Sequence, residues 1–193
     1  MLTKMLSNPV VFNLQQKLCN SYENVKTEFS DYFKEESLNI LDLGCSTGIA
    51  GRGICDISKH KYIGIDITQE YIDFARKERP GVDYRVMDGR QLEFPDHFFD
   101  IVMFVGVLHH MDNQTAEACL KEVRRTLKPT GFLLIAEPVF TPNSLLSNAF
   151  LSLDRGKFIR ESSQYIDLTH EFELIRQQYF KLSLHRFISI VAR

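Results

Sequence analysis

The chain has 193 residues, of which 44% are hydrophobic and 25% are charged, and its formal net charge is −2. This length is enough for one domain with a core of its own, and the composition excludes a wholly disordered chain, a collagen-like fibre and a membrane bundle. A dedicated nucleic-acid binder usually carries a basic excess, so no nucleic-acid partner is expected.

The four cysteines, Cys19, Cys45, Cys55 and Cys119, form neither a CxxC pair nor another zinc-ligand spacing. Reduced thiols of this kind are typical of a cytoplasmic protein. The N-terminus lacks the apolar region of a signal peptide, and the longest apolar stretch, Ile101–Leu108, is too short to span a bilayer. We therefore expect a cytoplasmic chain with no transmembrane segment and no bound metal.

The N-terminal part has a helical pattern over residues 10–33, with Asn20-Ser21 as a candidate break. Apolar positions recur there at steps of three or four residues, which places them on one face of a helix. We expect this face to pack on the core or to act as a lid. Its members are Tyr22, Val25, Phe29 and Phe33.

Five short apolar runs follow and alternate with helical segments. Continuous apolar runs indicate strands buried on both faces, and strand–helix alternation predicts right-handed βαβ units in a parallel sheet. Helices are predicted from Thr68 to about Glu78 and from Asn113 to Pro129. The predicted strands are residues 39–43, 62–66, 84–88, 100–105 and 131–136.

The end of the chain has a different pattern. Residues 173–180 and 185–192 both have strand character, and the few residues between them leave no room for a helix, so this pair is predicted to be antiparallel. The expected fold is therefore α/β, a Rossmann-like doubly wound sheet that is mostly parallel and ends in an antiparallel hairpin.

The residues at the predicted strand ends indicate a ligand site. Residues 42–48 read Asp-Leu-Gly-Cys-Ser-Thr-Gly, in which Gly44 and Gly48 allow a sharp turn and close approach of a ligand to the backbone. Asp66 ends the next strand 18 residues after Gly48, and it suits a ribose diol because a carboxylate accepts both hydroxyl protons. Asp88-Gly89 follows the third strand and suits the adenine amine. Together these features predict an adenosine-containing ligand.

The charge of the loop narrows the choice of ligand. Asp42 directly precedes the glycines, and no GK[ST] sequence follows them. A loop that grips phosphate favours positive or neutral side chains, which argues against a P-loop and against a nicotinamide dinucleotide. A carboxylate suits an ammonium or sulfonium group, and S-adenosylmethionine has both.

These motifs resemble those of class I S-adenosylmethionine-dependent methyltransferases, in particular the small-molecule group with a ubiquinone-biosynthesis-like core. The similarity runs from about Asn39 to Glu137, half of the chain, with several motifs in the family's order. Besides the glycine loop and the two acids, it includes residues 94–102, the following Val107-Leu108-His109-His110-Met111, and residues 127–132. The resemblance implies the seven-stranded methyltransferase fold and S-adenosyl-L-methionine as the cofactor.

Carried over by position, the resemblance assigns the methionine end of the cofactor to the glycine loop and the ribose and adenine to the acids. The family usually has glycine where this chain has Ser46, and serine can be accommodated there if the local φ is negative. The residues expected to bind the cofactor are Asp42, Gly44, Cys45, Ser46, Gly48, Asp66, Ile67, Tyr71, Asp88, Gly89, Val105 and Leu108.

Candidates for catalysis are His109 and His110, where a base could face the methyl group, and Glu137 at the end of the fifth strand. Each also has a non-catalytic interpretation. Many members of the family carry the histidine pair whatever their substrate, and Glu137 could be a solvated or capping carboxylate. A general base is needed only if the acceptor carries a proton of high pKa. The candidate substrate contacts are Tyr22, Phe140 and Arg160, the last also being interpretable as part of a solvated basic cluster.

We expect a single methyltransferase domain in four parts. These are an N-terminal helical lid (1–36), a cofactor-binding core (37–137), a substrate-side insertion (138–172) and the terminal strands (173–193). The insertion is short and partly apolar, so in-line methyl transfer to a small, partly apolar acceptor is the expected function. A non-catalytic cofactor-binding or scaffold protein and an NAD-dependent oxidoreductase are the alternatives. The acceptor, the methylated atom and the oligomeric state do not follow from the sequence.

Overall fold

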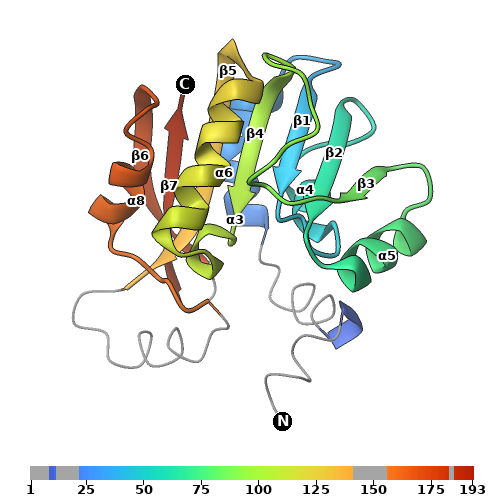
Figure 1. Cartoon of the computed structure of the whole chain (residues 1–193), viewed down its shortest axis with the longest axis horizontal. Coiled ribbons are helices and arrows are strands. Elements are labelled where there is room, and N and C mark those ends of the chain that lie inside the picture. The colour runs from blue at the N-terminus through green and yellow to red at the C-terminus, as the bar shows by residue number, and fades with distance from the viewer. Residues whose placement is uncertain (1–8, 12–21, 141–155, 183–184) are drawn as a thin grey trace.

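The computed structural model describes residues 9–11, 22–140, 156–182 and 185–193, which form a seven-stranded sheet with helices on both faces (Figure 1). The strand order is β3-β2-β1-β4-β5-β7-β6. Neighbouring strands from β3 to β5 are parallel, and β7 is antiparallel to both β5 and β6. The predicted α/β fold is confirmed. The strands are β1 (Asn39–Leu43), β2 (Lys61–Asp66), β3 (Asp83–Val86), β4 (Phe99–Val105), β5 (Leu127–Val139), β6 (Leu174–Leu182) and β7 (His185–Ala192).

Two hydrophobic clusters cover the two faces of the sheet. Helices α6 and α8 contribute to the first cluster, and α3, α4 and α5 contribute to the second. The helices are α3 (Glu23–Phe29), α4 (Ile49–Ile54), α5 (Gln69–Glu78), α6 (Asn113–Thr126) and α8 (Ser162–Leu168), with short 3-10 turns η1 (Ser30–Phe33) and η2 (Leu108–His110).

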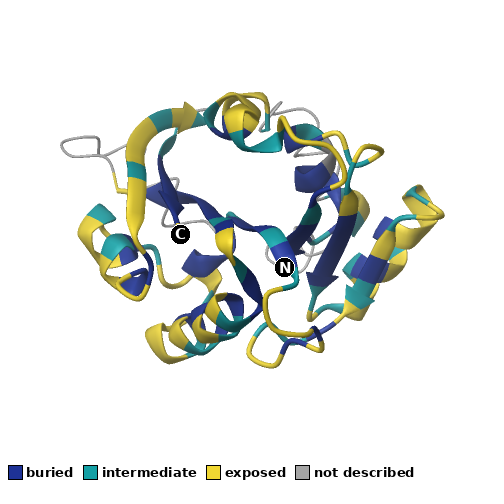
Figure 2. Ribbon diagram, turned by 90° about the horizontal axis from the view of Figure 1, so that it is seen from above, coloured by how far each residue is buried: buried dark blue, intermediate teal, exposed yellow. Residues whose placement is uncertain are grey.

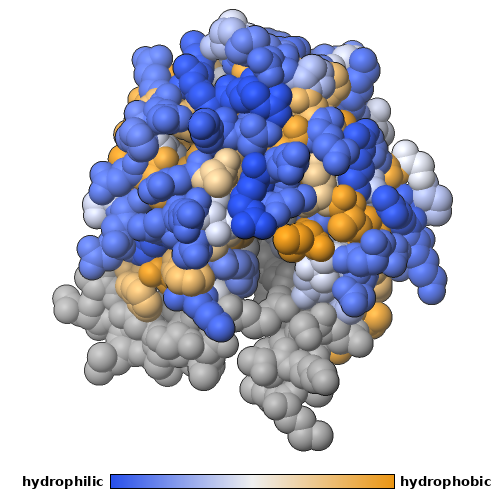
Figure 3. All heavy atoms as spheres, in the orientation of Figure 1, coloured by the Kyte–Doolittle hydropathy of each residue, from blue (hydrophilic) through white to orange (hydrophobic). Residues whose placement is uncertain are grey.

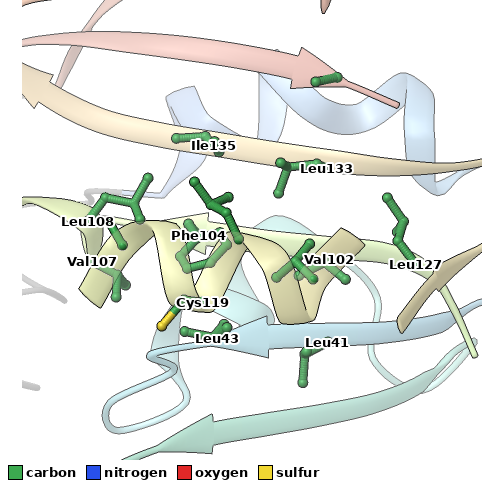
Figure 4. Packing of buried hydrophobic residues seen from close by; sticks show 14 of the residues in the cluster. Leu41, Leu43, Val102, Phe104, Val107, Leu108, Cys119, Leu127, Leu133 and Ile135 are labelled. Carbon is green, nitrogen blue, oxygen red and sulfur yellow. The ribbon is translucent and has the colours of Figure 1, made fainter. Parts of the chain in front are cut away.

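The central strands are buried on both sides, which explains their continuous apolar sequences. Along β4, Val102 and Phe104 belong to the first cluster, whereas Ile101 and Met103 belong to the second. Figure 4 shows Val102 and Phe104 packed among side chains of β1, β5 and α6. In Figure 2 the dark blue of buried residues follows the sheet through the middle of the molecule. The alternation is the one expected of a pleated strand between two helical layers.

Strand β5 begins at Leu127, earlier than the predicted run at residues 131–136. Its pairing with β4 jumps from Phe99↔Leu127 to Ile101↔Phe132, so a bulge absorbs the intervening residues. Pro129 lies in this bulge, where its missing N–H costs no ladder hydrogen bond. The predicted helix before it ends at Thr126 instead.

Helices α4 and α8 were not predicted from the sequence. α4 has only six residues, and two of them are glycines, so its intrinsic helix propensity is poor. α8 has seven residues and begins with a capping box, in which Glu161 and Gln164 exchange hydrogen bonds between side chain and backbone. Both helices are too short to show an apolar periodicity.

The N-terminal helix α3 packs against the second face of the sheet. Val25 and Phe29 are fully buried there, as the apolar stripe predicted, and the candidate break at residues 20–21 lies outside the described residues. The Glu28 carboxylate accepts a hydrogen bond from Ser189 Oγ at 2.8 Å and lies 3.7 Å from the Arg176 guanidinium. These contacts fix α3 to the terminal strands.

No helix within the described ranges has the length and apolarity needed to cross a membrane. Cys45, Cys55 and Cys119 are buried free thiols, and Cys19 lies outside the described residues.

Candidate active site

A cavity of about 1040 Å³ opens at the carboxyl ends of β1, β2 and β4. This is the place where the strand order reverses, between β1 and β4, and where ligands of open α/β sheets bind. In Figure 1 these strand ends point toward the lower side of the molecule. Figure 3, in the same orientation, shows a largely hydrophilic outer surface with hydrophobic atoms scattered among the hydrophilic ones.

The loop after β1 needs glycine at two positions. Gly44 has a φ of 77°, and a Cβ there would lie 2.5 Å from Val107 Cγ1. The backbone N–H groups of Gly44 and Cys45 both donate to Ile65 O, which folds the loop back over β2. Gly48, with a φ of 70°, starts α4, and a Cβ there would collide with the Tyr84 hydroxyl. The loop is therefore packed tightly from behind.

Ser46 adopts a φ of 50°, so the condition of a negative φ, under which serine would fit easily, is not met. The left-handed conformation is retained because Ser46 N donates to Asp66 Oδ2 at 3.0 Å. Its hydroxyl is buried without a hydrogen-bond partner and belongs to a residue that lines the cavity. Such an orphaned hydroxyl is suited to a polar group of a bound ligand.

Asp66 links this loop to the end of β2. Its Oδ2 accepts from Ser46 N, and its Oδ1 accepts from Thr68 N at 2.8 Å. Each carboxylate oxygen keeps lone-pair capacity for a further donor, such as a ribose hydroxyl. Ile67 is 67% exposed beside it and lines the cavity together with Tyr71. An exposed apolar side chain at this place can cover one face of a planar base.

Asp88 is held by Arg90, a residue that sequence reasoning missed. The guanidinium Nε lies 3.0 Å from both carboxylate oxygens, and Nη2 lies 2.6 Å from Oδ2. These hydrogen bonds lower the pKa of Asp88, so it stays ionised. Arg90 and Gly89 line the cavity as well. The spacing in the sequence could have indicated this contact, because a side chain two positions after Asp88 in a turn can fold back onto its carboxylate.

Asp42 does not line the cavity, contrary to the expected cofactor contact. It is 1% exposed, and it accepts a hydrogen bond from Tyr62 Oη at 2.5 Å on the α3/α4 side of the sheet. Burial raises its pKa to about 7. Gly48 is also absent from the cavity lining. Asp42 lies behind the loop because the pleat of β1 directs successive side chains to opposite faces of the sheet, and Gly48 lies behind it at the start of α4, against Tyr84.

Leu108 and Glu137 are buried beneath the cavity rather than exposed to it. Leu108 is fully buried in the first cluster, as Figure 4 shows. The Glu137 carboxylate is also fully buried. Its Oε1 accepts from the backbone N–H groups of Val107 and Leu108 at 2.7 Å each, and its Oε2 lies 2.7 Å from His109 Nδ1. Glu137 thereby holds the loop after β4.

Arg160 does not reach the cavity and is not placed to bind a substrate. It is 5% exposed, and its guanidinium donates to the carbonyls of Leu108 and Met111 at 2.7 Å each and to Asn113 Oδ1. Phe140 is 41% exposed but is likewise absent from the described lining. The sequence shows only that Arg160 belongs to a basic cluster, which suggested a solvated or substrate-binding role. Its structural role could not be recognised because its hydrogen-bond partners lie about 50 residues away in the sequence.

The other end of the cavity is built by segments far apart in the sequence. His109 and His110 line it, their ring centroids 4.1 Å apart, and Tyr22 reaches it from the start of α3. Three residues around the β6–β7 turn complete it, and no sequence motif pointed to them: Leu182, His185 and Phe187. The described lining at this end is mainly apolar and aromatic.

Comparison with known proteins agrees with this geometry. A family model described as a methyltransferase domain matches residues 40–131. A demethylmenaquinone methyltransferase of Chlorobaculum parvum is 29% identical over 61% of this chain and 48% of its own length. A probable tRNA methyltransferase 9B of Homo sapiens is 30% identical over 63% of this chain and 29% of its own length. A crystal structure of a SAM-dependent methyltransferase from Archaeoglobus fulgidus superposes with a TM-score of 0.72 at 20% identity, over 94% of this chain and 98% of that one.

Residues 40–131, just under half of the chain, are therefore similar to a methyltransferase domain, and the chain shares the fold of the solved SAM-dependent methyltransferase. It spans less than half the length of the two curated relatives named above.

The site fits S-adenosylmethionine on three observations. Gly44 leaves no room for a side chain, so the backbone itself forms the cradle. The Ser46 hydroxyl is buried without a partner where a polar ligand group would satisfy it. The acids Asp66 and Asp88 lie at the ends of β2 and β3, which suits ribose hydroxyls and an adenine amine. Of the residues expected to bind the cofactor, all of which the structure describes, only Asp42, Gly48 and Leu108 lie away from the cavity.

Proposed function

We propose that this chain transfers the methyl group of S-adenosylmethionine to a small, partly apolar acceptor. One observation carries the proposal: a single cavity joins the glycine loop and its acids to an end lined by His109, His110 and apolar side chains such as Phe187. The first end suits the cofactor, and the second leaves room for an acceptor beside it. A volume of about 1040 Å³ is at the upper end of ordinary ligand sites, which suits two molecules.

Each residue that was expected to bind the cofactor and that lines the cavity has a proposed role. Gly44, Cys45 and Ser46 hold the methionine end, and Val105 offers its carbonyl to the methionine ammonium. Asp66 binds the ribose, while Ile67 and Tyr71 contact the base and Asp88-Gly89 contact its edge. Bound there, S-adenosylmethionine supplies a methyl group that is activated by its sulfonium.

The chain then contributes mainly by positioning. The loop after β4 is fixed between Glu137 and Arg160, so residues 107–111 form a firm wall at the junction of the two ends. A wall of this kind can align an acceptor behind the methyl group for in-line displacement, and alignment alone lowers a barrier substantially. The apolar lining excludes water that would compete with the acceptor.

A small acceptor is favoured over a macromolecule by the lining and by the charge. The described acceptor end presents Tyr22, Met111, Leu182 and Phe187, which suit an apolar molecule. The formal net charge of −2 offers no general attraction for RNA. Among the relatives, one is named for a quinone and another for tRNA, so the acceptor class of this chain rests on its own cavity.

The first test is titration calorimetry with S-adenosylmethionine, its demethylated product S-adenosylhomocysteine, and NAD. Wild type is expected to bind both adenosyl ligands with micromolar affinity and NAD not at all, and Asp66→Ala is expected to lose that binding. No binding of either adenosyl ligand by folded wild type would overturn the proposal. Cofactor binding without methyl transfer to any acceptor would favour a scaffold role, and binding of NAD alone would favour an oxidoreductase.

A further inference from the structure

The cofactor end of the cavity contains a guanidinium whose partner is a carboxylate of the same site. Among the described residues that line the cavity, Arg90 is the only arginine or lysine, and its side chain is 54% exposed. A guanidinium in a nucleotide-binding site commonly binds phosphate, whereas S-adenosylmethionine carries no phosphate. Arg90 contacts Asp88 instead, which indicates a role that acts through this carboxylate.

The contact between Arg90 and Asp88 restrains the carboxylate from several directions. Nε lies 3.0 Å from both carboxylate oxygens, Nη2 lies 2.6 Å from Oδ2, and the backbone N–H of Arg90 donates to Oδ1 at 2.9 Å. A fork of this kind fixes the plane of the carboxylate, which a single hydrogen bond would not do. The Asp88 side chain is still 34% exposed and lines the cavity, so part of it remains open to a ligand.

The backbone of this turn is held by close packing. A Cβ on Gly89 would lie 3.0 Å from Leu43 Cδ2 and 3.1 Å from Cys119 Sγ, so the turn fits tightly between β1 and α6. Because the backbone is held in this way, the direction of the Asp88 carboxylate depends on its side-chain torsions. Arg90 restrains those torsions.

We propose that Arg90 orients the Asp88 carboxylate toward the 6-amino group of the cofactor's purine, so that this site selects adenine over a 6-oxo purine such as hypoxanthine. The inference rests on the proposed function and adds a specificity-determining residue to it. Asp88 is the residue that touches the purine, and Arg90 is a positioning residue that acts through Asp88.

The selectivity follows from the hydrogen bonding at position 6 of the purine. The adenine amine donates hydrogen bonds, and an ionised carboxylate only accepts them. Hydrogen bonds from Arg90 lower the pKa of Asp88, which keeps it in this accepting form. Hypoxanthine has a carbonyl oxygen at position 6, so two acceptors would face each other there. A polar group left without its partner in this way lowers affinity by about 10- to 100-fold.

Two ligands that differ at this one position test the selectivity: S-adenosylhomocysteine and its 6-oxo counterpart, S-inosylhomocysteine. Calorimetry on wild type is expected to give the adenine ligand a Kd about 10- to 100-fold lower. Arg90→Ala is expected to weaken the adenine ligand about 5- to 10-fold and to leave the inosine ligand within about twofold, because only the first uses the oriented carboxylate. Arg90→Lys keeps the charge without the fork and should recover only part of the selectivity.

The chain offers a matched control in a second Asp-x-Arg pair. Arg85 Nε and Nη2 donate to the two oxygens of Asp83 at 2.9 Å and 2.6 Å, and neither of these described residues lines the cavity. Arg85→Ala removes the same type of contact on β3 and should leave both Kd values unchanged. His170→Gln, a change at an exposed histidine outside the cavity lining, should also match wild type.

A double-mutant cycle tests whether Arg90 acts through Asp88. Asp88→Asn is expected to bind the two ligands with similar affinity, because the amide can turn either its oxygen or its NH₂ group toward position 6. Adding Arg90→Ala to Asp88→Asn should then change neither Kd further. A residue that only stabilised the fold would instead give additive effects in the cycle.

Three results would overturn the proposal: equal or tighter binding of the inosine ligand by wild type, unchanged selectivity in Arg90→Ala, or additive effects in the cycle. Tighter binding of S-adenosylhomocysteine by Arg90→Ala would overturn it as well, since Arg90 would then compete with the purine amine for Asp88. Failure of folded wild type to bind either ligand would instead overturn the proposed function, so the two failures are distinguishable.

Discussion

At the level of single residues, Gly44 is required for two reasons that can be separated. Its φ of 77° is unfavourable for other residues, and a Cβ would strike Val107. Gly81 has a φ of 100°, but a Cβ there would meet no heavy atom within 4 Å, so only its backbone conformation favours glycine. Comparing alanine substitutions at Gly44 and Gly81 therefore separates the effect of backbone strain from that of a steric clash.

Gly44→Ala is expected to lower the free energy of unfolding by about 2–4 kcal/mol and to weaken cofactor binding at least tenfold. Gly81→Ala is expected to cost only about 1–2 kcal/mol and to leave binding intact. Urea unfolding and calorimetry measure both quantities. Equal effects of the two substitutions would mean that Val107 yields to the extra methyl group.

Asp42 gives a pH dependence whose sign follows from burial. Its pKa is raised to about 7, so the folded state holds a proton that the unfolded state loses near pH 4. Stability should therefore fall as the pH rises through this window, by about 2 kcal/mol between pH 5.5 and pH 7. Above about pH 7 Asp42 is ionised in the folded state, so the free energy of unfolding is lowered by the full penalty of burying its carboxylate.

Asp42→Asn should remove this dependence while its amide oxygen still accepts from Tyr62. Urea unfolding at about pH 5.5 and about pH 8 should show the variant gaining on wild type at the higher pH. Calorimetry at neutral pH should show unchanged cofactor affinity, because Asp42 lies behind the loop. A loss of binding would restore the cofactor role that the sequence suggested for Asp42.

At the level of elements, the 3-10 turn η2 lies between two buried charges. Glu137 accepts from N–H groups at its start, and Arg160 donates to the carbonyls of Leu108 and Met111 at its end. The charges match the polarity of a helical turn, with the carboxylate at the N-terminal end. A loop that carries His109 is thus fixed from both ends by residues of the following strand and segment.

Arg160→Met is expected to lower the free energy of unfolding by about 2–4 kcal/mol, because two carbonyls and Asn113 lose their donor inside the protein. Cofactor affinity should change less than twofold. Arg124→Met, a change at an exposed arginine over Phe172, should have little effect on either quantity. Equal stability of the two variants would show that solvent replaces the Arg160 contacts.

The sequence predicted helices and strands whose hydrophobic pattern lies within a few neighbouring residues. It did not predict features that depend on contacts between residues far apart in the sequence. The runs at β1, β2 and β4 could be recognised because strands buried on both faces are continuously apolar. Helix α4, with two glycines in six residues, had no such signal. Arg160 was interpreted as part of a solvated basic cluster because nothing near it in the sequence shows that it caps Leu108 and Met111.

At the level of the whole molecule, the two ends of the cavity differ in how far the sequence reveals them. The cofactor end follows from motifs at successive strand ends, which a parallel sheet brings to one edge. The acceptor end joins α3, the loop after β4 and the β6–β7 hairpin, and its lining residues Leu182, His185 and Phe187 carry no motif. Their meeting depends on the antiparallel return of β7 beside β5.

Because cofactor residues come from several elements, binding should stabilise the molecule as a unit. A ligand at 100 times its Kd adds about 2.7 kcal/mol to the free energy of unfolding. For a chain of this size we expect S-adenosylmethionine to raise the Tm by about 5–10 °C, with a smaller rise at lower concentration. Differential scanning fluorimetry across a ligand titration measures this shift.

The matched variants make the thermal shift specific. Asp66→Ala should lose it because Asp66 both joins the loop to β2 and faces the cavity, whereas His170→Gln should keep it in full. His109→Gln should also keep it, since His109 belongs to the acceptor end. A shift that disappears in His109→Gln would show that the two ends of the cavity are not energetically separate, and the division into a cofactor half and an acceptor half would have to be abandoned.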